Sequence, residues 1–426
     1  MTRDEVRNEE RREKWLSLEE KVGGENGREI VAALKALYDV YSPKAINWLG
    51  NLYDPALGGF YYSESAQRTE GYLPDIESTI EALAIIEASG MSGGANWYDV
   101  IPDWLKKRVG EFTLSLQHPD GYFYHPQWGS EISNLRKSRD LGTGRRLLRF
   151  TGFEPKYPVP SAPTKDGSFD MSNAPERFKS LENYLAYLDK LDIPHRSYNA
   201  GSEMNSQFGE VRAYGELLGV DLVEITMQRF DEYQREDNGL WNEEINYYGA
   251  NGLHKISWIY NWTNRPIRYY EKAIESAMKV IMSDVPAGGS VDVYNPWHAI
   301  GEVLINCKNH CTPEKYAELR ERVYAFAPAA IRKSAEKISV FNKPDGGMSY
   351  LRDYSCPTSQ RAPAAVPNSV ESDVNGFACA STSLVTSIYR SLGLSEYMVP
   401  LYTASDLRLF LSILEKREKE YQENKK

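Results

Sequence analysis

Hydrophobic residues recur along this chain mainly at the spacing of an α-helix. Ile30, Val31, Leu34 and Leu37, for example, repeat every one to three residues and share one face of a helix over 28–41. The same pattern predicts helices over 75–89, 101–116, 181–191, 206–218, 222–235, 267–282, 297–307, 313–326, 329–340, 382–392 and 404–426. Strand-like alternation is nearly absent. The pattern therefore predicts an all-α protein.

A glycine followed by aromatic or large apolar residues recurs between the predicted helices. It occurs at positions 58–61, 120–123, 238–241 and 345–350. Gly59, Gly121, Gly239 and Gly346 fit multiples of about 57 residues, and a period of this size is typical of helical-hairpin arrays. Six such hairpins can close into a ring. The alternative is that Asp-Gly and Asn-Gly are simply common loop dipeptides.

Two of these turns resemble sequences of known toroid families. The segment from Gln117 to Phe123 resembles the Gln-x-x-Asp-Gly-x-aromatic repeat of terpenoid cyclases and prenyltransferases. The segment from Asp237 to Trp241 resembles the Gly-Leu-Trp turns of six-hairpin glycosidases. The resemblance implies an (α/α)6 toroid, a closed barrel of helical hairpins with long loops at one mouth. We expect it to form a single domain over 30–426, after a charged N-terminal extension over 1–29.

Composition and charge narrow the classes of partner. The chain has 29 Tyr and 9 Trp against 13 Phe, an excess that suits wet clefts because these rings keep a polar group. Its net charge of −10 disfavours nucleic acid as a partner. We find no apolar leader or membrane-length apolar stretch, and no phosphate loop or strong metal motif. The expectation is a cytoplasmic protein with no membrane, metal or cofactor, and an open oligomeric state.

Carboxylates in polar segments are the first candidates for chemistry. Cleavage of a glycosidic bond requires one carboxyl group that donates a proton and a second that activates water or attacks the sugar. Several acidic residues precede predicted helices or lie in polar loops, where capping of the helix is the alternative role. The candidate catalytic residues are the carboxylates Asp75, Asp120, Glu203 and Asp373, together with His125.

Rings interleaved with polar side chains suggest sugar binding. The segment 238–262 is especially rich in such rings and is expected to be a loop, and Asn295 with Pro296 predicts the start of a helix at Trp297. The candidate substrate-binding residues are Glu77, Tyr124, Trp128, Arg136, Asn205, Trp241, Tyr248, His254, Trp297 and His298.

The leading hypothesis is a glycoside hydrolase that acts on oligosaccharides, with Asp75 as the first choice for one carboxyl role. A uronate lyase with a Tyr or His base is the runner-up, drawing on Tyr124, His125, Arg136, Asn205, Tyr248 and His254. A terpenoid cyclase or prenyltransferase is a third hypothesis, although residues 373–376 depart from the Asp-x-Asp-Asp acid motif of the cyclases. A non-catalytic sugar-binding protein is the last.

Overall fold

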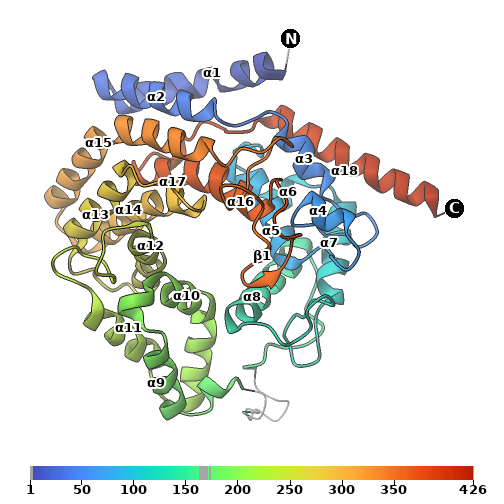
Figure 1. Ribbon diagram of the computed structural model, residues 1–426, viewed down its shortest axis with the longest axis horizontal. Coiled ribbons are helices and arrows are strands. Elements are labelled where there is room, and N and C mark those ends of the chain that lie inside the picture. The colour runs from blue at the N-terminus through green and yellow to red at the C-terminus, as the bar shows by residue number, and fades with distance from the viewer. Residues whose placement is uncertain (1–2, 163–170, 172–173, 426) are drawn as a thin grey trace.

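The computed structural model describes residues 3–162, 171 and 174–425, which fold mainly into helices (Figure 1). The first part contains α1 (Arg3–Val22), α2 (Gly24–Tyr38), α3 (Ala45–Asn51), α4 (Glu64–Arg68), α5 (Ile76–Ala88), α6 (Trp97–Val100), α7 (Asp103–Ser115) and α8 (Asn134–Thr151). The middle contains η2 (Glu176–Phe178), α9 (Leu181–Lys190), α10 (Ile193–Leu218), α11 (Leu222–Tyr233), α12 (Tyr247–Trp262) and α13 (Tyr270–Met282).

The last part contains α14 (Val291–His310), α15 (Pro313–Ser339), α16 (Val374–Ala378), the π-helical segment η3 (Cys379–Ser383), α17 (Leu384–Ser391), η4 (Ser395–Tyr397) and α18 (Ala404–Asn424). A two-stranded antiparallel hairpin, β1 (Thr358–Ser359) and β2 (Ala362–Pro363), is the only sheet among the described residues. The prediction of an all-α protein is confirmed.

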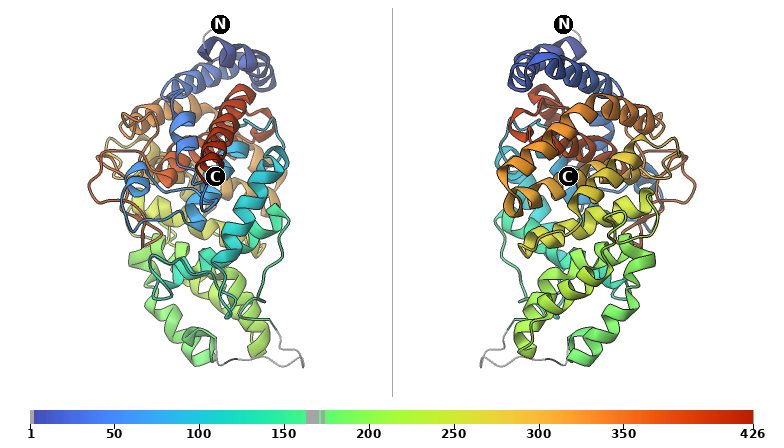
Figure 2. Two further views of the ribbon diagram at one scale, coloured as in Figure 1. Left: turned by 90° about the vertical axis from the view of Figure 1, so that its right-hand side faces the viewer. Right: turned by 90° about the vertical axis from the view of Figure 1, so that its left-hand side faces the viewer.

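The helices form two sets by their contacts. In the first set, α5 contacts α8, α8 contacts α10, α10 contacts α12, α12 contacts α14, α14 contacts η3 and α17, and α16 and η3 contact α5. Helices of the second set pack against these: α7 on α8, α11 on α10, and α13 and α15 on α14. Figures 1 and 2 show α1 and α2 at one end of the molecule and α9 at the opposite end.

Many of the tyrosines belong to the core rather than to a cleft. Tyr38, Tyr41 and Tyr260 are buried, and their hydroxyl groups donate to Val399 O at 2.6 Å, Ala380 O at 2.8 Å and Asp231 Oδ1 at 2.7 Å. A buried Tyr is stable when its hydroxyl group finds such a partner. The excess of Tyr over Phe therefore reflects buried hydrogen bonds between segments as well as the lining of a cavity.

Several predicted element boundaries are wrong. The two helices predicted over 313–326 and 329–340 are one helix, α15, which continues through Pro328. Helix α14 begins at Val291 and continues through Pro296, at the cost of one backbone hydrogen bond, so Asn295 is not its cap. The ring-rich segment expected as a loop is largely helix α12, which Asn246 caps by accepting from Gly249 N at 2.9 Å. Helix α10 begins at Ile193 rather than near position 206, with non-helical φ/ψ at Arg196, so the expected polar loop before it is also helical.

Candidate functional site

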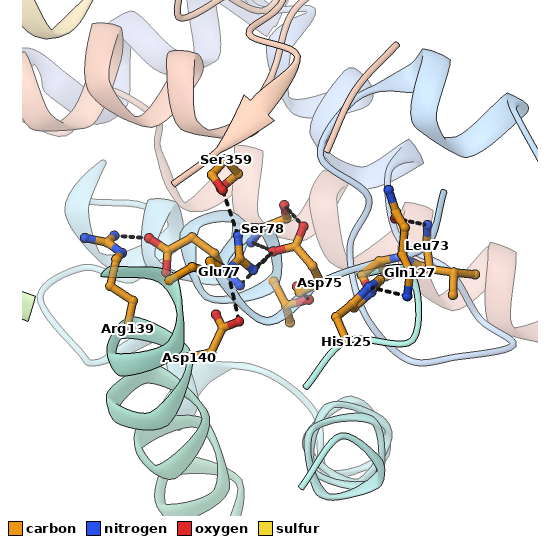
Figure 3. A network of polar contacts seen from close by, with 12 residues as sticks. Leu73, Asp75, Glu77, Ser78, His125, Gln127, Arg139, Asp140 and Ser359 are labelled. Carbon is orange, nitrogen blue, oxygen red and sulfur yellow. Dashed lines mark hydrogen bonds and ion pairs between the residues drawn. The ribbon is translucent and has the colours of Figure 1, made fainter. Parts of the chain in front are cut away.

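Asp75 caps the N-terminus of α5. Its Oδ1 accepts from the backbone N–H groups of Glu77 and Ser78, at 3.0 and 3.1 Å, and its Oδ2 accepts from the Ser78 hydroxyl group at 2.5 Å. Arg136 Nη2 also donates to Oδ1, at 2.8 Å. The Asp75 side chain is buried, and both of its oxygens take part in contacts that hold the start of α5 (Figure 3).

Arg136 joins three segments of the chain. Besides Asp75 at the start of α5, its guanidinium donates to Asp140 Oδ2 on α8 at 2.9 Å and to the backbone oxygen of Ser359 in the hairpin at 3.0 Å. The ring of Trp128 lies 5.0 Å from it. Arg136 is only 1% exposed, and burial raises the pKa of Asp140 to about 6 in spite of the guanidinium beside it. We refer to Asp75, Arg136, Asp140 and Ser359 as the Arg136 cluster.

The other residues of the Gly121 turn lie beside this cluster. His125 Nε2 donates to Pro74 O at 2.8 Å, its Nδ1 accepts from Gln127 N at 3.2 Å, and its ring stacks on Trp128 with centroids 4.1 Å apart. Burial lowers the pKa of His125, so its ring is neutral at pH 7. Tyr124 donates to the exposed Asp120 at 2.8 Å. These contacts fix the turn.

A cavity of about 480 Å³ lies among the helices of the first set. Residues of α5, α8, α10, α12, α14, α16 and η3 line it, together with the hairpin. Its charged lining residues are Glu81, Arg139, Lys255 and Arg361, and its aromatic ones are Tyr198, Trp258, Tyr294 and Tyr350. The wall thus carries three cationic side chains and one carboxyl group in a chain whose net charge is −10.

Glu81 is the only residue with a carboxyl group among the described residues that line the cavity. Burial raises its pKa well above the usual range, and the carboxylates of Asp75 and Asp373 raise it further. Its buried Oε2 has no hydrogen-bond partner among the described residues. Burial and the neighbouring carboxylates thus both favour the protonated, uncharged form of Glu81.

Lys255 and Arg139 carry the positive charge of the wall. Burial lowers the pKa of Lys255 to about 8, with the charge of Arg139 acting in the same direction. Its ammonium group lies 5.2 Å from the ring centre of Trp258. Arg139 forms a close ion pair with the buried Glu77, which fixes the guanidinium at the wall (Figure 3). Lys255 is a group that exchanges its proton close to physiological pH.

Three tyrosines complete the polar wall. Burial raises the pKa of Tyr198 to about 12 and raises those of Tyr294 and Tyr350 well above the usual value. The hydroxyl groups of Tyr198 and Tyr350 also bond to each other. All three are neutral hydrogen-bond donors at pH 7.

Two irregular backbone segments contribute to the same wall. The π-helical segment η3 supplies Cys379, whose thiol donates to Asn375 Oδ1 at 3.2 Å. The turn of the hairpin supplies Gln360 and Arg361, whose φ angles of 50° and 71° are unfavourable for residues other than glycine. Single π-helical turns and strained turns are both frequent at functional sites.

A buried polar cluster lies on α12 and α14 next to this wall. His254 Nδ1 bonds to Asn295 Oδ1 at 2.6 Å, and His298 Nε2 bonds to Glu302 Oε1 at 3.1 Å. Trp258, which lines the cavity, donates from its ring nitrogen to Glu302 at 2.8 Å. Burial lowers the pKa of both histidines. His254 and His298 do not line the cavity, and both imidazole rings contact Trp258 in edge geometry.

None of the predicted site residues is among the described residues that line the cavity. Asp373, fully buried, caps α16 through Gly376 N at 2.6 Å and also accepts from Tyr350 N at 2.8 Å and Cys356 N at 3.0 Å. Trp241 and Trp297 are core residues with no exposed surface. The structure brings Asp75, Glu77, His125, Trp128 and Arg136 together in or beside the Arg136 cluster.

Three predicted residues on α10 and α12 lie outside the cavity lining. Glu203 accepts from Tyr187 at 3.2 Å and pairs with Arg361 at 4.0 Å, so it lies one contact away from the wall. Asn205 donates to Lys255 O at 3.5 Å, and the ring of Tyr248 lies 6.0 Å from that of Tyr198. Each of them touches a lining residue without lining the cavity.

The predicted site residues do not include five residues that line the cavity: Glu81, Lys255, Tyr198, Tyr294 and Tyr350. The sequence carries a signal for Glu81, a lone carboxylate within the apolar helical run from Ile80 to Ile86. An acid at such a position is rarely buried without a reason.

No set of three or more His, Cys, Asp or Glu side chains within the described residues is arranged to hold a metal ion. No helix in the described part of the chain is both long and apolar enough to cross a membrane. Neither the scan against protein-family models nor the search of curated proteins finds a match to this chain.

Proposed function

We propose that this protein is a carbohydrate-active enzyme that cleaves an acidic oligosaccharide by elimination at a uronate unit bound in the cavity. The observation that carries the proposal is the cavity wall, where three basic side chains and one carboxyl group with a raised pKa meet in an acidic protein. A carboxylate-bearing sugar complements such a wall. The proposal is the uronate lyase of the sequence analysis, with a different set of residues.

The fold that we propose for this activity is the (α/α)6 toroid. Its support is the series of contacts from α5 through α8, α10, α12 and α14 to η3 and α16, which contact α5 again. Every helix of this series contributes residues to the cavity. In this arrangement α7, α11, α13 and α15 are outer helices.

The wall supplies the groups that elimination requires. Arg139 and the hydroxyl of the protonated Glu81 carboxyl group bind the uronate carboxylate and stabilise the negative charge that builds on it when the neighbouring carbon loses its proton. Lys255, whose pKa of about 8 gives it a neutral fraction near physiological pH, accepts that proton in its neutral form. The electron pair of the broken C–H bond forms the new C=C bond, the bond to the glycosidic oxygen breaks, and a tyrosine hydroxyl of the wall protonates the leaving oxygen.

Hydrolysis is the second candidate, and one observation favours it. Glu81 is a carboxyl group whose raised pKa favours the protonated form, as a glycosidase requires of the acid that protonates the leaving group. The second carboxyl group is lacking among the described residues that line the cavity, and this ranks hydrolysis below elimination. The charged wall also disfavours a terpenoid cyclase, whose cations need apolar and aromatic surroundings.

The test is digestion of uronate oligosaccharides, followed by ultraviolet absorbance and by a reducing-sugar assay. Elimination produces an unsaturated uronate that absorbs, whereas hydrolysis releases reducing ends without absorbance. Lys255→Met is expected to abolish the absorbance signal, and Lys272→Met, at a side chain that is 55% exposed, is the matched control. Reducing ends without absorbance would replace elimination by hydrolysis. Binding of the same sugars without any product would indicate a non-catalytic sugar-binding protein.

A further inference from the structure

Three arginines follow Arg139 along helix α8. Arg146 lies seven residues further on, which is two helical turns or about 10 Å along the axis and places it on nearly the same face. Arg145 and Arg149 flank it, and all three line a second cavity of about 560 Å³ with Glu154 as its only acidic lining residue among those described. A row of positive charge thus extends from the central cavity to the end of α8.

These three arginines have no ion pair with any residue in the described part of the chain, although other arginines of this acidic protein do. Arg108, for instance, pairs with Glu418, and Arg322 pairs with Glu275 at 2.9 Å. Two of them also act on another arginine of the row. Burial, followed by the charge of Arg149, lowers the pKa of Arg146, and the charge of Arg146 contributes to the lowered pKa of Arg139.

The helix dipole accounts for only part of this charge. Positive side chains are stabilised in the last turn of a helix, and Arg149 lies there, with its guanidinium 4.9 Å from the ring centre of Phe150. Arg145 and Arg146 lie one turn earlier, where the dipole has little effect. Repulsion among the arginines destabilises the folded protein when no counter-charge is present, and bound anions would remove that repulsion.

The surface of α8 is open at Gly142. Gly142 lies between Arg139 and Arg146 on the exposed side of α8, and no atom lies within 4 Å of the position that a Cβ would take there. Gly142 also lines the second cavity. A ligand chain therefore meets no side chain at this position.

We propose that Arg145, Arg146 and Arg149 form a second anion-binding site, which holds further acidic units of a polyanionic oligosaccharide while one unit occupies the central cavity. This inference rests on the proposed function and sharpens it, because it names the substrate as a chain with several acidic units. Exposed charge pairs are individually weak, so the site acts through several contacts at once.

The test compares two triple variants with the same change of charge. In the first, Arg145, Arg146 and Arg149 are each replaced by Gln. In the control, the scattered and exposed Arg12, Arg212 and Arg332 are each replaced by Gln. Calorimetry measures the binding of hexagalacturonate and of a heparin-derived hexasaccharide, with neutral cellohexaose for comparison.

The first variant is expected to bind the two anionic hexasaccharides about tenfold more weakly than the parent, and the control variant within about twofold of it. Gly142→Glu keeps every arginine and adds a negative charge within the row, so it too should weaken binding. Equal affinity of both triple variants and the parent would overturn the second site, as would no binding of either anionic probe to the parent.

The two proposals can fail separately. Binding that depends on the three arginines but gives no product would retain the second site and reject the enzyme. Turnover that is equal in the parent and the first variant, on short and long uronate chains alike, would retain the enzyme and reject the second site.

Discussion

The Arg136 cluster and the wall of the central cavity both contain charged groups from α5 and α8, but the two regions treat them differently. In the Arg136 cluster, the guanidinium has three partners, at Asp75, Asp140 and the backbone of Ser359, within 3.0 Å. In the cavity wall, Glu81 keeps an oxygen without a partner, and Lys255 has a pKa of about 8.

This difference separates structural charges from candidate catalytic ones. A buried charge whose partners are all present holds segments together. Removal of one partner leaves the others buried without a compensating charge, which destabilises the folded protein. A buried group that lines a cavity, lacks a partner and has a displaced pKa is a candidate for proton transfer. Asp140 also has an oxygen without a partner and a pKa of about 6, but it does not line the cavity. The two regions should therefore respond to mutation in opposite ways, with loss of stability in one and loss of activity in the other.

The largest expected effect is on stability, in Arg136→Met. The substitution leaves the carboxylates of Asp75 and Asp140 buried without their cation, which typically costs about 3–5 kcal/mol. It also releases the hairpin from α8, because Ser359 O loses its donor. Chemical denaturation followed by circular dichroism measures the free energy of unfolding. The control is Arg361→Met, which removes an arginine that is 46% exposed and should change stability by less than about 0.5 kcal/mol. Equal losses in the two variants would show that the cluster has no special structural role.

Glu81→Gln should have the opposite profile. Gln cannot donate a proton, and loss of a general acid typically lowers the rate about 10²- to 10⁴-fold. Stability at pH 7 should rise rather than fall, because the raised pKa of the buried Glu81 is a cost of folding in a chain where the unfolded Glu is ionised, and Gln does not carry that cost. Turnover of uronate oligosaccharides and a urea denaturation curve test the two halves of this prediction. A variant that keeps full activity but loses several kcal/mol would move Glu81 into the structural class.

Lys255 gives a smaller effect, which depends on pH. Its folded-state pKa of about 8 lies below its ordinary value of 10.5, so below pH 8 the folded protein bears the full cost of a buried ammonium group. As pH rises from about 8 to 10.5, the folded protein releases the proton first, and stability increases. Lys255→Met should therefore be more stable than the parent by about 1–3 kcal/mol at pH 7, and the gap should shrink at pH 10.

Urea denaturation at both pH values measures this gap, with the exposed Lys272→Met as the control. The control should show the same difference from the parent at pH 7 and at pH 10. A gap for Lys255→Met that does not change with pH would mean that burial does not displace the pKa of Lys255.

The sequence predicts the fold class well because helical periodicity is a local property. Ile30, Val31, Leu34 and Leu37 are all buried on one face of α2, as their spacing indicates. Boundaries are harder, because tertiary packing overrides local signals. Pro296 is a strong start signal, yet α14 extends past it to Val291, whose side chain lines the cavity.

The site is harder to predict because its residues come from many distant segments. Asp75 and Asp373 precede helices, and the sequence allows for capping as an alternative role; the structure shows that both are caps. Lys255 lies on α12 and Tyr294 on α14, and only packing brings them to the wall with Glu81. The excess of Tyr and Trp in the sequence does not distinguish rings of the core, such as Trp241, from rings of the cavity wall, such as Trp258.

The smallest expected effect is on turnover, in Asp120→Asn. Asp120 is exposed and is one of the catalytic residues predicted from the sequence. An Asn oxygen can still accept from Tyr124 or from the backbone of Tyr122, so the turn should be preserved. Because Asp120 does not line the cavity, turnover should stay within about twofold of the parent. The same digestion assay, run beside Glu81→Gln, measures it. If Asp120→Asn abolished turnover while Glu81→Gln retained it, the reaction would have to take place at the Gly121 turn, and the cavity wall would not be the active site.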